Sequence, residues 1–210
     1  MQIQIDASIV GHDCGLPVNP DEAYPNRGGD GYISFGRCEA FADLLAFAFS
    51  CELTRVATHV FSCAACHGAY SDAGLGEVTF HEDFGHLLSP MGYEYAKAGY
   101  LTGIAYAMKG LGALLQRFRD MPDGASNLLD NSVIYTTSCV GEPTAHLLTD
   151  YPMLVIGKGG GLLKGDLHHR VDGENTSKVP FSLLKLFGSQ ETSFGLDEGL
   201  TTETIPELLA

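Results

Sequence analysis

Short apolar runs alternate with helical patterns along this chain, and this alternation limits the fold more than any other feature of the sequence. Residues 54–62, 131–138 and 151–157 are apolar and rich in β-branched side chains, which predicts strands. Helical spacing covers residues 38–50, 93–119 and 177–188. Strands that alternate with helices predict a mostly parallel sheet with helices on both faces, which is a three-layer α/β fold.

The longest helical pattern has a second unusual feature. Its apolar positions follow three/four spacing, at Leu101, Ile104, Met108, Leu111, Leu115 and Phe118. Four glycines interrupt it, and each costs about 1 kcal/mol relative to alanine in a helix. These are Gly99, Gly103, Gly110 and Gly112. We therefore expect this helix to pack closely against the sheet.

The amino-terminal part differs from the rest of the chain. Residues 11–36 are rich in Gly, Pro, Asn and Asp and show no periodicity, so residues 1–36 are predicted to form an irregular lead-in. Residues 37–210 are then expected to form one α/β domain, which suits a chain of 210 residues. The first residues lack the basic start and apolar core of a secretory signal, and the location stays open.

The formal net charge of −14 disfavours several kinds of partner. Such a surface repels nucleic-acid phosphates and anionic lipids, so neither a nucleic acid nor a membrane is expected as a partner. No apolar run reaches the roughly 20 residues needed to span a bilayer. A small-molecule substrate, even an anionic one, stays open because a bound metal reverses the field locally.

Two cysteines stand in a motif with known chemistry. Cys63-Ala-Ala-Cys66-His67 matches the attachment signature of c-type haem, in which two thiols bond the vinyl groups and the histidine ligates iron. The alternative is a loop with two thiols, free or joined as a disulfide. The six cysteines form no regular framework, and the apolar contexts of Cys51 and Cys139 predict small buried side chains.

A second candidate site lies in the polar, Gly-rich loop of residues 63–92. His81, Glu82, Asp83 and His86 place two imidazoles and two carboxylates within six residues. This composition suits a divalent metal ion. A solvated polar loop is the alternative reading of the same residues.

The strand predicted over residues 131–138 leads to a third group of polar side chains. Ser138, Glu142 and His146 follow its carboxyl end, where ligands of open α/β sheets bind. If this strand end and the histidine loop meet at one sheet edge, His81 or His86 lies within roughly 10 Å of Glu142 or His146, about twice the span of a metal site.

The same strand carries a resemblance to a known superfamily. Residues 129–142 (LDNSVIYTTSCVGE) resemble the sulfatase and alkaline phosphatase-like superfamily, in which this segment brings in metal ligands. A closer resemblance is to uncharacterised bacterial families of that superfamily, known only as domains of unknown function. It rests on residues 51–58 (CELTRVAT), 128–132 (LLDNS), 151–161 (YPMLVIGKGGG) and 182–184 (SLL), and covers about residues 38–198.

The resemblance implies an alkaline phosphatase-like fold, of which this chain is the carboxyl-terminal part, and a metal-dependent hydrolase. It implies that His81, His86 and His146 are metal ligands and that Glu142 is a ligand or general base. It also implies exported full-length relatives and, as partner, a missing amino-terminal half, with a homo-oligomer as the alternative. One departure concerns Cys139 and Val140, which stand where sulfatases place an aspartate-histidine ligand pair.

Three further functions stay open at this point. In a glycoside hydrolase, Glu82 and Glu142 would be the carboxylate pair that acts as general acid and general base. Cys63, Cys66 and His67 would serve a c-type haem protein. A non-catalytic domain that only packs against a partner is the third. Nothing in the sequence distinguishes an ester from a glycoside as substrate, and it names neither the metal nor the oligomeric state.

Overall fold

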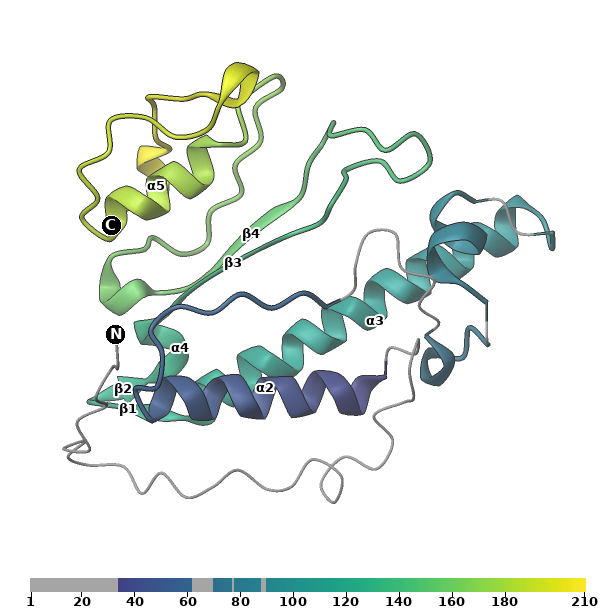
Figure 1. Ribbon diagram of the computed structural model, residues 1–210, viewed down its shortest axis with the longest axis horizontal. Helices are drawn as coiled ribbons and strands as arrows, with labels where there is room; N and C mark the ends of the chain where they lie inside the picture. Colours follow the sequence, from purple (N-terminus) through teal and green to yellow (C-terminus); the bar gives the residue numbers. More distant parts are fainter. Residues whose placement is uncertain (1–33, 62–69, 77, 88–89) are drawn as a thin grey trace, which may run out of the picture. The chain divides into compact units, whose positions relative to one another are not determined.

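The computed structural model describes residues 34–61, 70–76, 78–87 and 90–210 (Figure 1). The chain divides into two compact units, residues 1–128 and 129–210, and each is described by itself. The first unit contains α2 (Phe35–Ser50), the 3-10 turn η1 (Ser71–Ala73), the π-helical turn η2 (Phe80–Gly85), α3 (Tyr93–Asp120), β1 (Pro122–Asp123) and β2 (Ser126–Asn127). α4 (Leu128–Asn131) leads into the second unit, which contains β3 (Val133–Thr137), β4 (Met153–Gly157), η3 (Gly159–Gly161), α5 (Lys178–Leu186), η4 (Asp197–Gly199) and η5 (Pro206–Leu208). No helix in the described ranges has both the length and the apolar character of a membrane span.

The two long helices of the first unit confirm the helical patterns in the sequence. α2 begins two residues before the predicted domain start, because the Ser34 side chain caps it by accepting a hydrogen bond from the Arg37 N–H at 3.3 Å. The rest of the predicted lead-in, residues 1–33, lies outside the described residues. α3 extends from Tyr93 to Asp120, one residue beyond its predicted end.

The glycines of α3 mark close contacts, as predicted, but their partners are aromatic rings and not a sheet. A Cβ atom built on Gly103 would lie 2.0 Å from the Phe80 ring, and one on Gly99 would lie 2.3 Å from the Phe84 ring. Gly110 makes room for Phe61 in the same way, at 2.6 Å. Because a glycine has no side chain, each of these positions leaves space on α3 for one aromatic ring.

An aromatic cluster holds the first unit together. Tyr70 and Tyr106 are buried and stack at a centroid distance of 5.5 Å, and Phe80 packs against Tyr70 at 4.8 Å. The Tyr106 hydroxyl donates to Asp72 Oδ1 at 2.5 Å, and the Phe35 N–H donates to Asp72 Oδ2 at 2.8 Å. One carboxylate therefore joins η1 to both long helices. Burial, with the hydrogen bond to Asp72, raises the pKa of Tyr106.

The strand predicted over residues 54–62 is not formed in its described part, residues 54–61. These residues follow α2 and pair with no described strand, although their β-branched side chains favour a ladder. Residue 62 lies outside the described residues. Side-chain composition favours an extended backbone, but a ladder also requires a neighbouring strand, which the sequence pattern cannot supply.

The other two predicted strands are formed, and they pair with each other. β3 and β4 are antiparallel, with Val133 opposite Gly157 and Tyr135 opposite Val155. The parallel arrangement predicted from the apolar runs is therefore wrong for this pair. A parallel pair needs a crossover connection, usually a helix, and residues 138–152 contain none. The predicted three-layer class as a whole stays a prediction.

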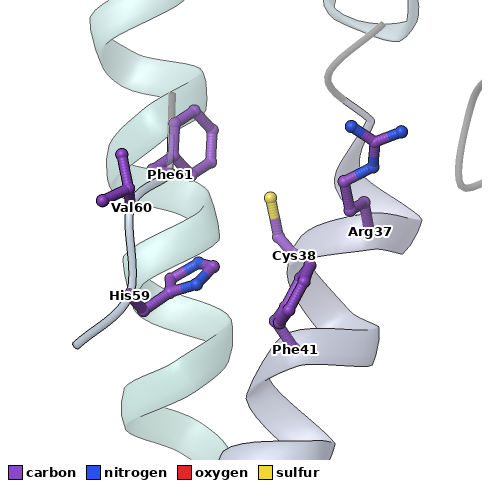
Figure 2. Close-up of a pocket in the computed structure, with 6 residues that line it drawn as sticks. All are labelled: Arg37, Cys38, Phe41, His59, Val60 and Phe61. Carbon is purple, nitrogen blue, oxygen red and sulfur yellow. The ribbon is translucent and has the colours of Figure 1, made fainter. Parts of the chain in front are cut away.

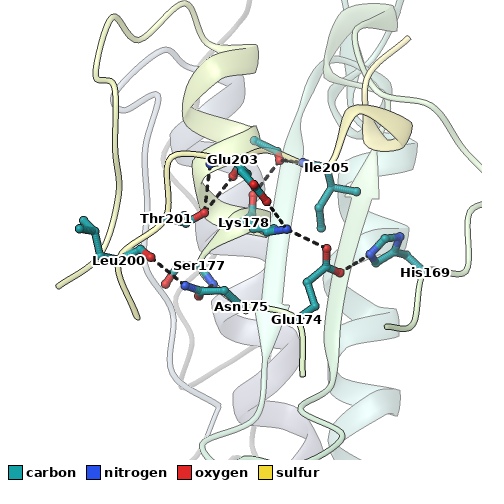
Figure 3. A network of polar contacts seen from close by, with 10 residues as sticks. His169, Glu174, Asn175, Ser177, Lys178, Leu200, Thr201, Glu203 and Ile205 are labelled. Atoms are coloured by element: carbon teal, nitrogen blue, oxygen red, sulfur yellow. Dashed lines mark hydrogen bonds and ion pairs between the residues drawn. The ribbon is translucent and has the colours of Figure 1, made fainter. Parts of the chain in front are cut away.

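A polar network ties the carboxyl-terminal segment of the second unit to α5 (Figure 3). Lys178 Nζ lies 3.2 Å from Glu174 Oε1 and 2.7 Å from Glu203 Oε2, and Glu174 also contacts His169. The fully buried Ser182 hydroxyl donates to the Lys178 carbonyl and accepts from the Ile205 N–H, both at 2.7 Å. These bonds satisfy the buried polar groups beside α5.

Both predicted ends of α5 are close to the observed ones. Ser177 occupies the N-cap position, but its side chain makes no capping bond; instead the Asn175 side chain accepts from the Ser177 N–H at 2.9 Å. The helix ends at Leu186, and Gly188 follows with a positive φ of 80°. Glycine adopts this left-handed conformation without steric cost, which explains why the helix ends close to residue 188, the end of its predicted range.

Candidate functional site

The two histidines of the predicted metal loop belong to a single π-helical turn, η2: His81 lies inside the turn and His86 is its C-cap residue. Asp83 closes its amino-terminal end by accepting from the Thr79 N–H at 3.0 Å and from the Thr79 hydroxyl at 3.2 Å. Phe84 is 1% exposed and fills the space beside Gly99. Phe80 stacks on Tyr100 at 5.8 Å and fills the space beside Gly103. The turn is therefore fixed both by hydrogen bonds and by packing on α3.

This geometry brings His81 and His86 together. Their Nε2 atoms lie 3.2 Å apart, their ring centroids 4.8 Å apart, and the rings are nearly perpendicular. In a regular α-helix, side chains five residues apart point about 140° away from each other. The wider π turn reduces that angle, so the local backbone creates the pair. Such turns are frequent at functional sites.

The distance between the two ring nitrogens suits two kinds of interaction. Two neutral imidazoles in opposite tautomers form a hydrogen bond at this separation. Alternatively, two nitrogens bound at 2.0–2.1 Å to one tetrahedral ion lie about 3.3 Å apart. The observed 3.2 Å is close to that value. The pair therefore has the spacing of two ligands of one metal ion.

The two carboxylates of this loop play different parts. Asp83 is engaged by Thr79 and stabilises the turn. Glu82 is exposed. From the sequence, both carboxylates were predicted to belong to a metal-binding loop. The hydrogen bonds by which Asp83 stabilises the turn were not predicted. The capping-box spacing in the sequence joins Thr79 to Glu82, and in the π turn Asp83, one residue later, makes the bonds to Thr79 instead.

In the second unit, Glu142 organises a turn of its own. The backbone of Glu142 pairs with that of Leu147, and its carboxylate accepts from the Thr144 N–H at 2.9 Å and the Ala145 N–H at 2.7 Å. The Ala145 hydrogen bond is the largest cause of a lowered pKa of Glu142. Of the two roles implied for this residue, the role of an anionic ligand suits such a carboxylate better than that of a general base.

His146 lies on the same turn and has a positive φ of 55°, which is uncommon for a residue other than glycine. Glu142 and His146 belong to the second unit, and His81, Glu82 and His86 to the first. The predicted meeting of the two groups, with a distance of roughly 10 Å, stays a prediction. The same holds for the separation of Glu82 and Glu142, on which the glycosidase alternative depends.

The remaining cysteine predictions have mixed outcomes. Cys51 is buried, as predicted, but it is disulfide-bonded and not a free thiol. Cys139 is exposed, so the prediction of a buried side chain is wrong. It lies two residues after the end of β3, where the chain leaves the ladder and no longer packs. The motif Cys63-Ala-Ala-Cys66-His67 lies outside the described residues, and the haem alternative stays untested.

A small hollow that was not predicted from the sequence lies between α2 and the segment that follows it (Figure 2). It is lined by Arg37, Cys38, Phe41, His59, Val60 and Phe61. Burial lowers the pKa of His59 and raises the pKa of the Cys38 thiol to about 11. The thiol is therefore protonated at neutral pH and is no activated nucleophile. Cys38 stands in an apolar helical pattern, which contains no signal for such a hollow.

A scan against protein-family models, a search of curated proteins and a search of solved structures each found no match for this chain.

Proposed function

We propose that this protein is a metal-dependent hydrolase and that the imidazoles of His81 and His86 hold its divalent ion. The observation that supports the proposal is the Nε2–Nε2 distance of 3.2 Å, close to the roughly 3.3 Å expected for two ligands of one tetrahedral ion. Both residues are half-buried on a turn that is braced from two sides. Ligands held in this way lose little side-chain entropy on binding.

The charge of the surroundings also favours a cation. Glu82 is exposed next to His81, and the chain carries a net charge of −14. When bound, a divalent metal supplies Lewis acidity that polarises a scissile ester or related bond. The chain's own contribution is to hold the two ring nitrogens in place through Phe80, Phe84 and Asp83.

The assignment of His146 and Glu142 as further ligands is a separate part of the proposal. It comes from the superfamily resemblance and from the position of both residues after β3. Glu142 contributes a carboxylate whose pKa is lowered, which keeps it anionic and suits a hard cation. The His81–His86 part does not depend on this assignment.

The first experiment measures metal binding. The purified protein is dialysed against Zn²⁺ or Mn²⁺, and bound metal is quantified by mass spectrometry and calorimetry. We expect about one ion per chain and an affinity at least tenfold lower in His81→Ala and in His86→Ala. His168→Ala, which changes an exposed histidine of the second unit, is the matched control and should bind like the wild type. His146→Ala and Glu142→Gln test the additional ligands separately.

The second experiment measures hydrolysis by the metal-loaded protein on chromogenic phosphate, sulfate, carboxylate and glycoside esters. Activity that disappears in His86→Ala and persists in Cys63→Ser/Cys66→Ser would support the hydrolase. Unchanged metal binding in both histidine variants would refute the site. Metal binding without hydrolysis of any substrate would leave the site intact and refute the hydrolase. An intense visible absorption band of the purified protein would instead support haem.

A further inference from the structure

Residues 54–61 leave α2 and run back beside it as an unpaired segment (Figure 1). Within the described part of the chain, the backbone N–H and C=O groups of residues 57–61 form no hydrogen bond. The groups of Val56 do form bonds, since its N–H donates to the Thr54 hydroxyl at 3.2 Å and its carbonyl accepts from that hydroxyl at 2.6 Å. An unpaired strand-like backbone is a template for another strand.

The segment is nevertheless held in place by one row of its side chains. The Phe61 ring packs on Tyr70 and Tyr106 at centroid distances of 6.1 Å and 6.4 Å, and the His59 ring lies 4.9 Å from that of Phe41. Val60 points away from the side on which His59 and Phe61 lie (Figure 2). Successive side chains that point to opposite sides are typical of a β-strand. Ala57 and His59 are exposed, so this row is held by the half-buried Phe61 and by the contact of His59 with Phe41.

The other row consists of exposed β-branched residues. Val56 is 82% exposed, Val60 is 67% exposed, and Thr58 between them is also exposed. Exposed valines on an unpaired, strand-like segment are unusual, because natural proteins protect such edges with charges or proline. The segment has one charged residue, Arg55, at its beginning, and no proline.

We propose that this segment pairs antiparallel with the same segment of a second copy of the chain, with Thr58 on the two-fold axis. The outer row reads Val, Thr, Val and is symmetric about Thr58. In this register Val56 lies opposite Val60 of the second copy, and the two Thr58 residues lie opposite each other. A two-fold interface requires such self-complementarity, and β-branched and Thr–Thr pairs stabilise antiparallel strands.

The available hydrogen-bonding groups agree with this register. If the two Thr58 residues form a non-hydrogen-bonded pair, the interchain hydrogen bonds come from Ala57 and His59. Neither residue has a backbone hydrogen bond in the described part of the chain. The groups of Val56 point to the opposite edge, so the bonds to Thr54 stay intact.

The test uses engineered disulfides in a Cys139→Ser background, because Cys139 is an exposed free thiol. In the proposed register the Cα atoms of the two Thr58 residues lie about 4.5 Å apart, within reach of a disulfide. Thr58→Cys is therefore expected to form a covalent dimer under mild oxidation. Ala57→Cys is the matched control, because the two Ala57 residues are diagonal neighbours at about 7 Å or more and should form at least tenfold less dimer.

A mixing experiment tests the register directly. Val56→Cys and Val60→Cys, purified separately, should form dimers when mixed but not when oxidised alone. Sedimentation of the wild-type chain over a hundredfold concentration range should show reversible dimers.

Three results would overturn the proposal. The first is a wild-type chain that stays monomeric at all concentrations. The second is a Thr58→Cys dimer no more abundant than that of the parent or of Ala57→Cys. The third is a Val56→Cys dimer that forms without Val60→Cys.

Discussion

The two turns that carry the predicted histidine ligands are held by different forces. η2 is fixed by aromatic packing on α3 in addition to the Asp83–Thr79 hydrogen bonds, since the buried Phe84 ring occupies the space beside Gly99. The turn of residues 142–147 is closed by hydrogen bonds within itself, from the Glu142–Leu147 backbone pair and from the Glu142 carboxylate to two N–H groups. The first turn thus depends on a helix elsewhere in the sequence, whereas the hydrogen bonds of Glu142 lie within residues 142–147.

This difference determines how each turn responds to mutation. Loss of a buried aromatic side chain costs several kcal/mol, whereas one hydrogen bond contributes about 1 kcal/mol. The geometry of His81 and His86 should therefore be sensitive to changes in α3 that touch neither histidine. The hydrogen bonds that Glu142 makes within its own turn should be less sensitive to such changes.

Phe84→Ala is expected to have the largest effect. Removal of a fully buried phenylalanine should lower the free energy of unfolding of the first unit by about 3–5 kcal/mol. It should also abolish metal binding by His81 and His86, because the turn loses its support. Urea denaturation followed by circular dichroism measures the first effect. Phe187→Ala is the control, because Phe187 is 69% exposed and its removal should change stability by about 0.5 kcal/mol or less.

Two glycine-to-alanine changes in the same helix should have opposite effects. A Cβ at Gly103 would lie 2.0 Å from the Phe80 ring, so Gly103→Ala should displace that ring and cost about 1–3 kcal/mol. Gly112 has no atom within 4 Å of the added Cβ, so Gly112→Ala should stabilise α3 by about 0.5–1 kcal/mol. Thermal unfolding of the two variants compares them. If both variants changed the stability equally and in the same direction, Phe80 would not pack against Gly103.

The helices and the strands β3 and β4 could be predicted because their signals are local. The spacing of apolar residues determines α2 and α3, and Gly188 marks the end of α5 by its own conformational freedom. The pairing of β3 with β4 could not be read from apolar runs, since a buried strand looks alike in parallel and antiparallel sheets. The missing α-helical connection in residues 138–152 was the available signal.

The candidate site was predictable in composition but not in geometry. The cluster of His81 and His86 in one loop pointed to a pair, yet a spacing of five residues fits no regular helix face. The π turn that brings them together depends on the positions at which Phe80 and Phe84 pack on α3. The glycine spacing in the sequence predicts close packing there, but it does not show which side chains pack against the glycines.

A smaller effect is expected from Asp83→Ala. The Asp83 carboxylate accepts two hydrogen bonds from Thr79, in the manner of a helix cap, so its removal should cost about 1 kcal/mol. It should also weaken metal binding severalfold by loosening the turn. Glu82→Ala is the neighbouring control for stability, since that side chain is exposed and its loss should change the free energy of unfolding by about 0.5 kcal/mol or less.

The smallest effect is expected from Glu142→Gln, and pH reveals it best. Hydrogen bonds to the N–H groups of Ala145 and Thr144 favour the ionised carboxylate and lower its pKa. A carboxyl group with a lowered pKa stabilises the folded turn above its unfolded pKa, and this contribution disappears as the pH falls through the folded pKa. The turn should therefore be protected at neutral pH and open more often in acid.

Amide hydrogen exchange at Thr144 and Ala145, corrected for intrinsic rates, measures this directly. In the wild type, protection of both amides should fall as the pH is lowered through the folded pKa of Glu142. In Glu142→Gln it should be weaker at neutral pH and independent of pH, because the amide side chain does not titrate. Glu191→Gln, an exposed glutamate, should retain the wild-type profile. A pH-dependent protection that persists in Glu142→Gln would mean that another group, and not this carboxylate, closes the turn.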